Sequence, residues 1–289
     1  MIEKLLPESV VAVEAFGEEG VREFGSAPLF PQEEALVARA VAKRRREFTV
    51  VRSCARRAME KLGVPAQPVL PGERGAPQWP DGLTGSMTHC AGYCAAALVR
   101  AADLASLGID AEPHEPLPEG VLAAIALPAE AEQLGRLAQA RPEVHWDRLL
   151  FSAKESVYKA WFPLTRKWLD FSEADIELTP ASAPVPPSAP VPPSAPVPAS
   201  ASVRPSASVR PSASVSPSAP VPPSALVPAS ASVPSSAFAT GSADGSYGVF
   251  RARLLVPGPV VGGHRLGHFD GRWSVRRGLV ATAVTVHHA

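Results

Sequence analysis

The clearest hydrophobic pattern in the chain lies between residues 148 and 164, where apolar positions recur every three or four residues. The apolar positions are Leu150, Ala153, Val157, Ala160, Trp161 and Leu164. Polar residues follow the same period on another face, at Arg148, Ser152, Glu155 and Lys159. This spacing predicts an amphipathic helix. It places the carboxylate of Glu155 one helical turn from the ammonium of Lys159.

A second pattern, upstream of this helix, is the strict alternation of apolar and acidic residues over positions 107–112. The apolar positions are Leu107, Ile109 and Ala111. Alternation of period two predicts a strand, and it turns Asp110 and Glu112 to the same side of a sheet. With Glu155 they supply three oxygen donors, the ligand type that Mg²⁺ prefers and Mn²⁺ accepts. With Lys154 and Lys159 beside them, such a site suits a magnesium-bound diphosphate.

Both patterns also allow simpler interpretations. A Glu and a Lys spaced i,i+4 on a helix most often form an exposed ion pair, which contributes about 0.3 kcal/mol. An Asp-x-Glu sequence at the end of a strand is most often a solvated face. Neither pattern alone establishes a site, so the functional assignment depends on a third segment, residues 85–98.

The third segment, Gly85-Ser-Met-Thr-His-Cys-Ala-Gly-Tyr-Cys-Ala-Ala-Ala-Leu98, is rich in small residues. It predicts two strands that meet at Ala91-Gly92, with a backbone that a ligand can approach closely. His89 is its informative side chain. A lone histidine in a strand is most often structural. A zinc site is disfavoured because the sequence has no second cluster of Cys and His at structural zinc spacing.

A basic helix is predicted from Gln32 to Leu62, with a break inside it because the span is long for one helix. Pro31 favours its start and Gly63 its end. Seven basic residues cluster in it: Lys43, Arg44, Arg45, Arg46, Arg52, Arg56 and Arg57. They form either a solvated face or a surface for RNA, a membrane or a phosphate-rich ligand. Phe48 is the only aromatic residue among them, which argues against single-stranded nucleic acid.

A repetitive segment separates the remaining predicted elements. From Ser182 the chain repeats six-residue units such as SAPVPP and SASVRP. Proline removes backbone donors and the repeats lack large apolar side chains, so residues 181–240 predict a disordered, partly polyproline II insertion. The other predicted elements are a helix within 113–148 and strands over 174–178, 247–256, 271–275 and 278–286. The insertion therefore interrupts a predicted hairpin.

Charge and composition exclude several classes of protein. Lys and Arg number 28 and Asp and Glu number 28, so the formal net charge is zero. The chain lacks the global basic field of a typical nucleic-acid binder. No run of residues has the form of a signal peptide or the length of a membrane span. Three cysteines cannot all be paired. We therefore expect a cytoplasmic protein that binds neither nucleic acid nor membrane.

Taken together, three segments resemble the 4′-phosphopantetheinyl transferases, specifically the long, monomeric, Sfp/EntD-like class. The segments are Gly85–Leu98, Gly108–Pro113 and Phe151–Leu164, and their order and spacing match the family over nearly the whole chain outside the insertion. The resemblance implies a Mg²⁺-dependent enzyme. It would move 4′-phosphopantetheine from coenzyme A to a serine of acyl or peptidyl carrier proteins and release 3′,5′-adenosine bisphosphate.

The resemblance also implies roles for residues that match the family's motifs. Arg44, Arg52 and Arg74 match its basic contacts to the phosphates of coenzyme A. His89 matches a contact to the 3′-phosphate. Backbone or hydroxyl contacts are expected from the neighbouring residues Ser86, Met87 and Thr88.

The catalytic roles rest on the resemblance and on side-chain chemistry. Asp110, Glu112 and Glu155 would hold the metal ion at the diphosphate, with Asp110 also in contact with coenzyme A. Glu155 is the candidate general base toward the serine, directly or through water. Lys159 would stabilise and protonate the leaving bisphosphate oxygen, and Lys154 would neutralise the diphosphate.

For the fold, the resemblance implies an α+β protein of two similar subdomains related by pseudo-two-fold symmetry. Residues 1–108 would form the subdomain that contacts the coenzyme A phosphates. Residues 109–289 would carry the metal and catalytic residues, interrupted by the insertion. Two rival functions remain open: a non-catalytic module that binds coenzyme A or a nucleotide, and an interaction protein that acts through its proline-rich repeats.

Overall fold

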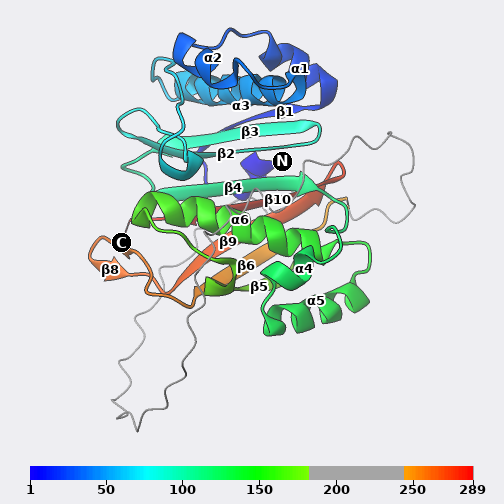
Figure 1. Cartoon of the computed structure of the whole chain (residues 1–289). Coiled ribbons are helices and arrows are strands. Elements are labelled where there is room, and N and C mark those ends of the chain that lie inside the picture. The colour runs from blue at the N-terminus through cyan, green and yellow to red at the C-terminus, as the bar shows by residue number, and fades with distance from the viewer. Residues whose placement is uncertain (182–243, 289) are drawn as a thin grey trace, which may run out of the picture.

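The computed structural model describes residues 1–181 and 244–288, and in them it combines helices with two main sheets (Figure 1). The helices are α1 (Gly17–Gly25), α2 (Pro31–Val37), α3 (Ala42–Lys61), α4 (Val121–Ile125), α5 (Pro128–Ala140) and α6 (Trp146–Thr165). The strands are β1 (Val11–Phe16), β2 (Leu83–Cys90), β3 (Tyr93–Arg100), β4 (Ser106–Pro113), β5 (Ala174–Pro180), β6 (Tyr247–Leu254), β7 (Val260–Val261), β8 (His264–Arg265), β9 (His268–Arg276) and β10 (Leu279–Val286). Short 3-10 helices are η1 (Ile2–Leu5), η2 (Glu73–Gly75) and η3 (Phe171–Glu173). The expected α+β class is confirmed.

The first sheet has the strand order β1-β3-β2, and α3 lies across one of its faces (Figure 1). The predicted hairpin is present, since β2 and β3 pair antiparallel on either side of Ala91-Gly92. Gly92 has a φ of +72°, a conformation that glycine adopts without strain. The predicted break in the basic helix is also present, because α2 ends at Val37 and α3 begins at Ala42.

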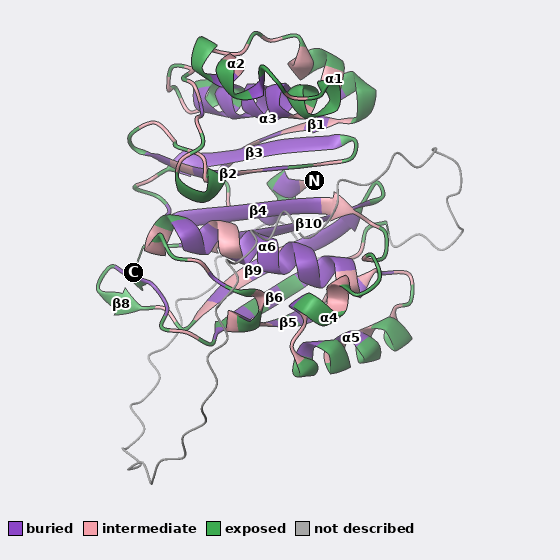
Figure 2. Cartoon of the chain, viewed as in Figure 1, coloured by how far each residue is buried: buried purple, intermediate pink, exposed green. Residues whose placement is uncertain are grey.

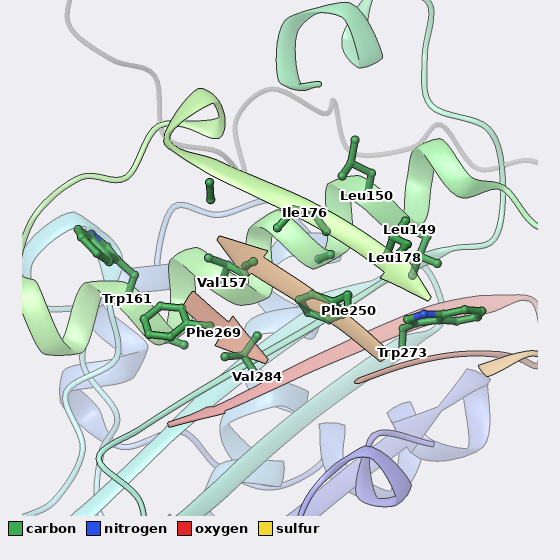
Figure 3. Packing of buried hydrophobic residues seen from close by; sticks show 14 of the residues in the cluster. Leu149, Leu150, Val157, Trp161, Ile176, Leu178, Phe250, Phe269, Trp273 and Val284 are labelled. Atoms are coloured by element: carbon green, nitrogen blue, oxygen red, sulfur yellow. The ribbon is translucent and has the colours of Figure 1, made fainter. Parts of the chain in front are cut away.

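The second sheet has the order β4-β10-β9-β6-β5, with α6 packed across β4 and β10. Its core joins Leu149 and Val157 of α6 to Phe250 and Trp273 of the sheet (Figure 3). Gly108 of β4 allows the close approach of the helix. A Cβ atom there would lie 2.0 Å from the Ser156 carbonyl oxygen, far inside van der Waals contact.

The polar stripe of α6 differs from the expectation for an amphipathic surface helix. Arg148, Ser152 and Glu155 are buried, and most of α6 is buried from end to end (Figure 2). The stripe faces the sheet: Ser152 Oγ lies 3.0 Å from Thr282 Oγ1 of β10. The simpler interpretation of Glu155 as half of an exposed ion pair is therefore wrong, because Glu155 is buried. A buried polar stripe needs partners on the sheet, and β4 and β10 supply them.

The two sheets meet where β2 and β4 lie next to each other (Figure 1). These strands belong to different sheets, and side chains of β2 join them. Ser86 Oγ accepts a hydrogen bond from the Ile109 amide at 3.1 Å, and Thr88 Oγ1 accepts one from the Ala111 amide at 3.1 Å. The acidic strand is thereby fixed against the His89 strand.

The change from the first sheet to the second occurs between Arg100 and Ser106, so the expected boundary between residues 108 and 109 falls inside β4. The predicted hairpin in the second half is confirmed, because β5 and β6 pair antiparallel with Pro180 opposite Gly248. Beyond residue 181, the predicted insertion at 181–240 lies outside the described residues. Pseudo-two-fold symmetry stays a prediction. In residues 1–181 and 244–288, no helix has both the length and the apolar character needed to cross a membrane.

Candidate active site

The centre of the site is an ion pair between α6 and β4. Lys159 Nζ donates to Asp110 Oδ1 at 2.7 Å, and Thr88 Oγ1 lies 3.4 Å from the same oxygen. Burial alone would lower the pKa of Lys159, but the charges of Asp110 and Glu155 raise it above its usual value. Lys159 is therefore held as a cation beside more than one carboxylate, and its side chain remains 24% exposed. A ligand can reach it.

A second ion pair lies at the other end of the same stripe. Arg148 Nη1 donates to Glu112 Oε2 at 3.1 Å. The remaining nitrogens of Arg148 bind the carbonyls of Glu115 and Pro116, which fixes the chain just after β4. Burial raises the pKa of Glu112 to about 8, and the charge of Asp110 adds to this effect. Arg148 and Lys159 oppose the shift without cancelling it, so Glu112 holds its proton up to a higher pH than a solvated carboxylate does.

The expected use of Asp110, Glu112 and Glu155 as one set of metal ligands stays a prediction, although the three carboxylates are close enough for their charges all to act on Lys159. Within residues 1–181 and 244–288, no three His, Cys, Asp or Glu side chains are grouped as a ready metal site. Two of the carboxylates pair with cations of α6, Asp110 with Lys159 and Glu112 with Arg148. The donor set nevertheless suits a divalent cation. Asp110 Oδ2 is buried and accepts no hydrogen bond from any described residue. An oxygen in that state is available to a cation.

A basic group adjoins this cluster on the side of α3. Arg44 Nη1 lies 2.9 Å from His89 Nε2, so the guanidinium donates and the imidazole accepts. The pKa of His89 is lowered to about 4, first by desolvation among the surrounding side chains and then by the charges of Arg44 and Lys159, with Asp110 opposing them, although part of the residue is exposed. His89 is therefore neutral at pH 7. Its ring lies between the basic residues of α3 and the Lys159–Asp110 pair, which makes the two groups parts of one site.

Arg52 belongs to the same basic group but is held more tightly. Its Nε donates to the Val69 carbonyl at 3.2 Å, and its guanidinium stacks over the ring of Phe48. Burial lowers the pKa of Arg52 to about 10, with a further contribution from Arg44 and opposition from Glu33. The side chain remains a cation at neutral pH.

The other predicted contacts to coenzyme A are more scattered. The hydroxyls of Ser86 and Thr88 accept hydrogen bonds from β4, as described above, and Met87 is partly buried against the core beneath α3. The guanidinium of Arg74 lies 5.6 Å from the ring of Trp168, in the second half of the chain. For these residues, contact with coenzyme A stays a prediction.

Lys154 is the predicted site residue that the structure places elsewhere. Its ammonium contacts Glu130 and the carbonyls of Phe171 and Ala174, on the side of α6 away from Asp110. These contacts engage the ammonium within the fold, and the expected contact of Lys154 with the diphosphate stays a prediction. Consecutive residues of a helix point about 100° apart, so Lys154 and its neighbour Glu155 cannot share one face.

Two residues of this arrangement received no role from the sequence. Arg148 carried a signal, because it lies on the same helical stripe as Glu155 and Lys159. Glu130 carried a weaker one. It stands two positions after Pro128 at the start of α5, where its carboxylate accepts the Leu127 amide at 2.7 Å, a common N-terminal cap. Its pairing with Lys154 depends on tertiary packing.

Comparison with known proteins gives the same assignment in both halves of the chain. The family model for the 4′-phosphopantetheinyl transferase N-terminal domain matches residues 32–99, and that for the 4′-phosphopantetheinyl transferase superfamily matches residues 106–188. The chain is 47% identical over 286 residues to 4′-phosphopantetheinyl transferase Svp of Streptomyces mobaraensis, covering 99% of this chain and 89% of that protein. Identity is 40% to PptT of Mycobacterium tuberculosis (99% and 98% covered) and 39% to Npt of Nocardia iowensis (98% and 99% covered), both named 4′-phosphopantetheinyl transferases.

Proposed function

Because the chain belongs to the 4′-phosphopantetheinyl transferase family, it transfers phosphopantetheine from coenzyme A to carrier proteins, and we propose that the α6–β4 cluster is where it does so. The observation that carries the proposal is the Lys159–Asp110 pair, which lies beside Glu155 and within the electrostatic range of His89. In this pair the partly exposed ammonium of Lys159 lies among carboxylates. The basic group of Arg44, Arg52 and His89 adjoins it.

Coenzyme A is bound, on this proposal, with its phosphates toward the basic group. Arg44 and Arg52 supply permanently charged guanidinium groups, whose planar donors match phosphate oxygens. His89 can donate from Nε2 to a phosphate oxygen after Arg44 turns to the ligand and the neutral imidazole takes its other tautomer. Arg74 and the backbone of Met87 complete the phosphate contacts. The diphosphate would then lie toward Lys159, since His89 separates the two groups.

The chain's own residues account for the proton and charge movements of the transfer. Glu155 accepts the proton of the carrier serine, directly or through a water molecule, as the hydroxyl oxygen attacks the β-phosphorus. Lys159, held charged by the carboxylates around it, stabilises the oxygen of the departing 3′,5′-adenosine bisphosphate and gives it a proton. Asp110 orients Lys159 through the 2.7 Å bond.

We propose Mg²⁺ as the metal, with Mn²⁺ as a substitute, and Asp110, Glu112 and Glu155 as the residues that would hold it. The support is the buried oxygen of Asp110, which accepts no hydrogen bond from the described residues, and the nearness of Glu112 and Glu155, whose charges both act on Lys159. A bound divalent cation would neutralise diphosphate oxygens and polarise the phosphorus under attack.

We also propose that the enzyme works as a monomer in the cytoplasm. All residues assigned above come from one chain, with the phosphate contacts mainly from α3 and β2 and the catalytic residues from β4 and α6. The cysteines are free thiols, as a reducing compartment maintains them.

The test is mass spectrometry of purified apo carrier proteins, from fatty-acid, polyketide, nonribosomal-peptide and siderophore pathways, after incubation with the enzyme, coenzyme A and Mg²⁺. We expect a mass gain equal to phosphopantetheine on at least one carrier, and loss of that gain when a chelator is added. Coenzyme A binding without any loading across the panel would instead support the non-catalytic alternative.

A further inference from the structure

Lys154 and Glu130 form a buried ion pair on the side of α6 that faces away from the candidate active site. Lys154 Nζ lies 2.8 Å from Glu130 Oε1, 2.7 Å from the Phe171 carbonyl and 2.8 Å from the Ala174 carbonyl. An ammonium has three N–H donors, so these three acceptors engage all of them. Lys154 is 3% exposed. It therefore has neither a donor nor an open path to offer a ligand.

Glu130 is engaged as fully as its partner. Besides Lys154, it accepts the Leu127 amide at 2.7 Å through Oε2 and the Ile176 amide at 2.7 Å through Oε1. This one carboxylate thus connects the start of α5, the middle of α6 and the strand β5. A buried carboxylate is stable only when its oxygens are satisfied in this way. The pair ties three elements together at a point next to Glu155.

The same pair belongs to a row of side chains that covers the free edge of β5. β5 is the last strand of the second sheet, and an edge strand exposes unpaired backbone groups. Side chains of α5, α6 and the residue after α5 bind four of these groups in succession. The contacts are Lys154 with the Ala174 carbonyl, Glu130 with the Ile176 amide, Gln133 with the Leu178 amide and Arg141 with the Ala181 carbonyl.

We propose that Lys154 is a positioning residue, which acts through its pair with Glu130 to set the rotation of α6 at which Glu155 and Lys159 meet Asp110. The inference rests on the proposed function, because it assigns a role within that site. Lys154 and Glu155 are consecutive, so any rotation of the helix that loosens one displaces the other. A direct contact between Lys154 and the diphosphate would require all three of its bonds to break and a buried carboxylate to lose its cation, a costly exchange.

The experiment compares Lys154→Met, Glu130→Met and the double variant with the wild-type enzyme, using one carrier protein and coenzyme A. Both single variants should lower kcat by about tenfold or more while the KM and Kd for coenzyme A stay within about twofold. Each leaves one buried charge without its partner, so both should also lower Tm. The double variant replaces the pair by apolar side chains, and it should regain Tm and part of the lost kcat.

Gln133→Leu is the matched control, because Gln133 binds the next amide of the same edge, that of Leu178, and this hydrogen bond joins α5 to β5 rather than to α6. It should lower Tm with kcat unchanged. Two results would overturn the proposal: a coenzyme A Kd raised about tenfold in Lys154→Met with kcat retained, or a fall in kcat for Gln133→Leu equal to that for Lys154→Met. If Lys154→Met does not fold, kcat and the coenzyme A Kd are measured on the double variant instead. A raised Kd with kcat retained would overturn the proposal there as well. Failure of the proposed function would appear separately, as a wild-type enzyme that loads no carrier.

Discussion

The two sides of α6 carry the same kind of ion pair in different surroundings. On one side Lys154 pairs with Glu130 at 2.8 Å, and on the other Lys159 pairs with Asp110 at 2.7 Å. The first pair is sealed, with side chains 2% and 1% exposed, whereas Lys159 is 24% exposed. Distance alone therefore does not distinguish a pair that holds the fold from a pair at a site.

The surrounding charge does distinguish them. The Glu130 oxygens are satisfied by one cation and two amides, so the first pair is complete. Around Lys159 there are three carboxylates, and one of them has a buried oxygen without a donor in the described chain. Burial lowers the pKa of Lys154 more than Glu130 raises it, while the carboxylates raise the pKa of Lys159 in spite of burial. The two pairs therefore differ in what surrounds the ammonium: one carboxylate and two carbonyls around Lys154, and several carboxylates around Lys159.

The largest effect that the comparison predicts is that of Asp110→Asn. It should lower the rate of carrier loading by about 10³-fold, because Lys159 loses its orienting partner and the metal loses a ligand. The free energy of unfolding should fall much less than the loading rate, since Lys159 keeps the charges of Glu155 and Glu112 nearby. Urea denaturation beside a loading assay measures both. Loading within tenfold of the wild-type rate would remove Asp110 from the site.

A smaller effect is expected on the basic side of the site. Arg52→Ala should raise the Kd for coenzyme A by about tenfold, with little change in kcat, because a phosphate loses one charged donor. Arg57→Ala is the control: it lies on the same helix, is exposed, and pairs only with Glu60 among the described residues. Isothermal titration calorimetry gives the affinities. An equal rise in Kd for both variants would mean that the loss of any positive charge on α3 weakens binding, and it would remove Arg52 from the site.

The pH dependence of the free energy of unfolding tests the carboxylates on the site's side of α6, through the titration of Glu112. Its pKa is about 8 in the folded protein against a usual 4.5, so the folded state holds a proton that the unfolded chain has lost between those values. Stability of the metal-free protein therefore falls as pH rises through this range. His89 and His114, with pKa values lowered to about 4, act in the opposite sense below 6.5.

The window from about pH 6.5 to 8 thus isolates Glu112 from the histidines. Glu112→Gln should flatten the fall in the free energy of unfolding across that window, measured by urea denaturation at several pH values. A slope that is the same in the variant and the wild type would show that Glu112 titrates normally.

The smallest effect is expected from replacing residues 182–243 by a short turn. β5 and β6 already pair up to Pro180 and Gly248, and the Ala181 amide donates to the Tyr247 carbonyl at 2.9 Å. A shorter connection between paired strands changes the closure entropy only by about 0.6 kcal/mol for each halving of its length. Loading activity should remain within about twofold of wild type. Loss of soluble protein would show that the segment is needed for folding.

Local pattern was sufficient to predict α6, β4, the β2–β3 hairpin and the interrupted basic helix. Each depends on residues close together in sequence: the helical period around Glu155, the alternation around Asp110, the small residues at Ala91-Gly92. The pairing of β5 with β6 was predicted as well, because strand patterns flank the repeats. These features need no knowledge of what the elements pack against.

The environment of the polar groups could not be predicted in the same way. The stripe of α6 is buried because Thr282, far along the chain, supplies a partner for Ser152. Lys154 turns away from the site because Glu130 and the end of β5 offer it acceptors. Both facts depend on tertiary packing, which the helical period of the sequence does not predict. The family resemblance identified the residues of the motif without showing which way each one points.

The most direct test of the central claim is carrier loading by Glu155→Gln, with coenzyme A binding measured on the same protein. If Glu155 is the base at a site shared by Asp110 and Lys159, the variant should bind coenzyme A within a few-fold of wild type. It should also give no mass gain on the carrier in the time that wild type loads it completely. Loading at the wild-type rate would contradict the account.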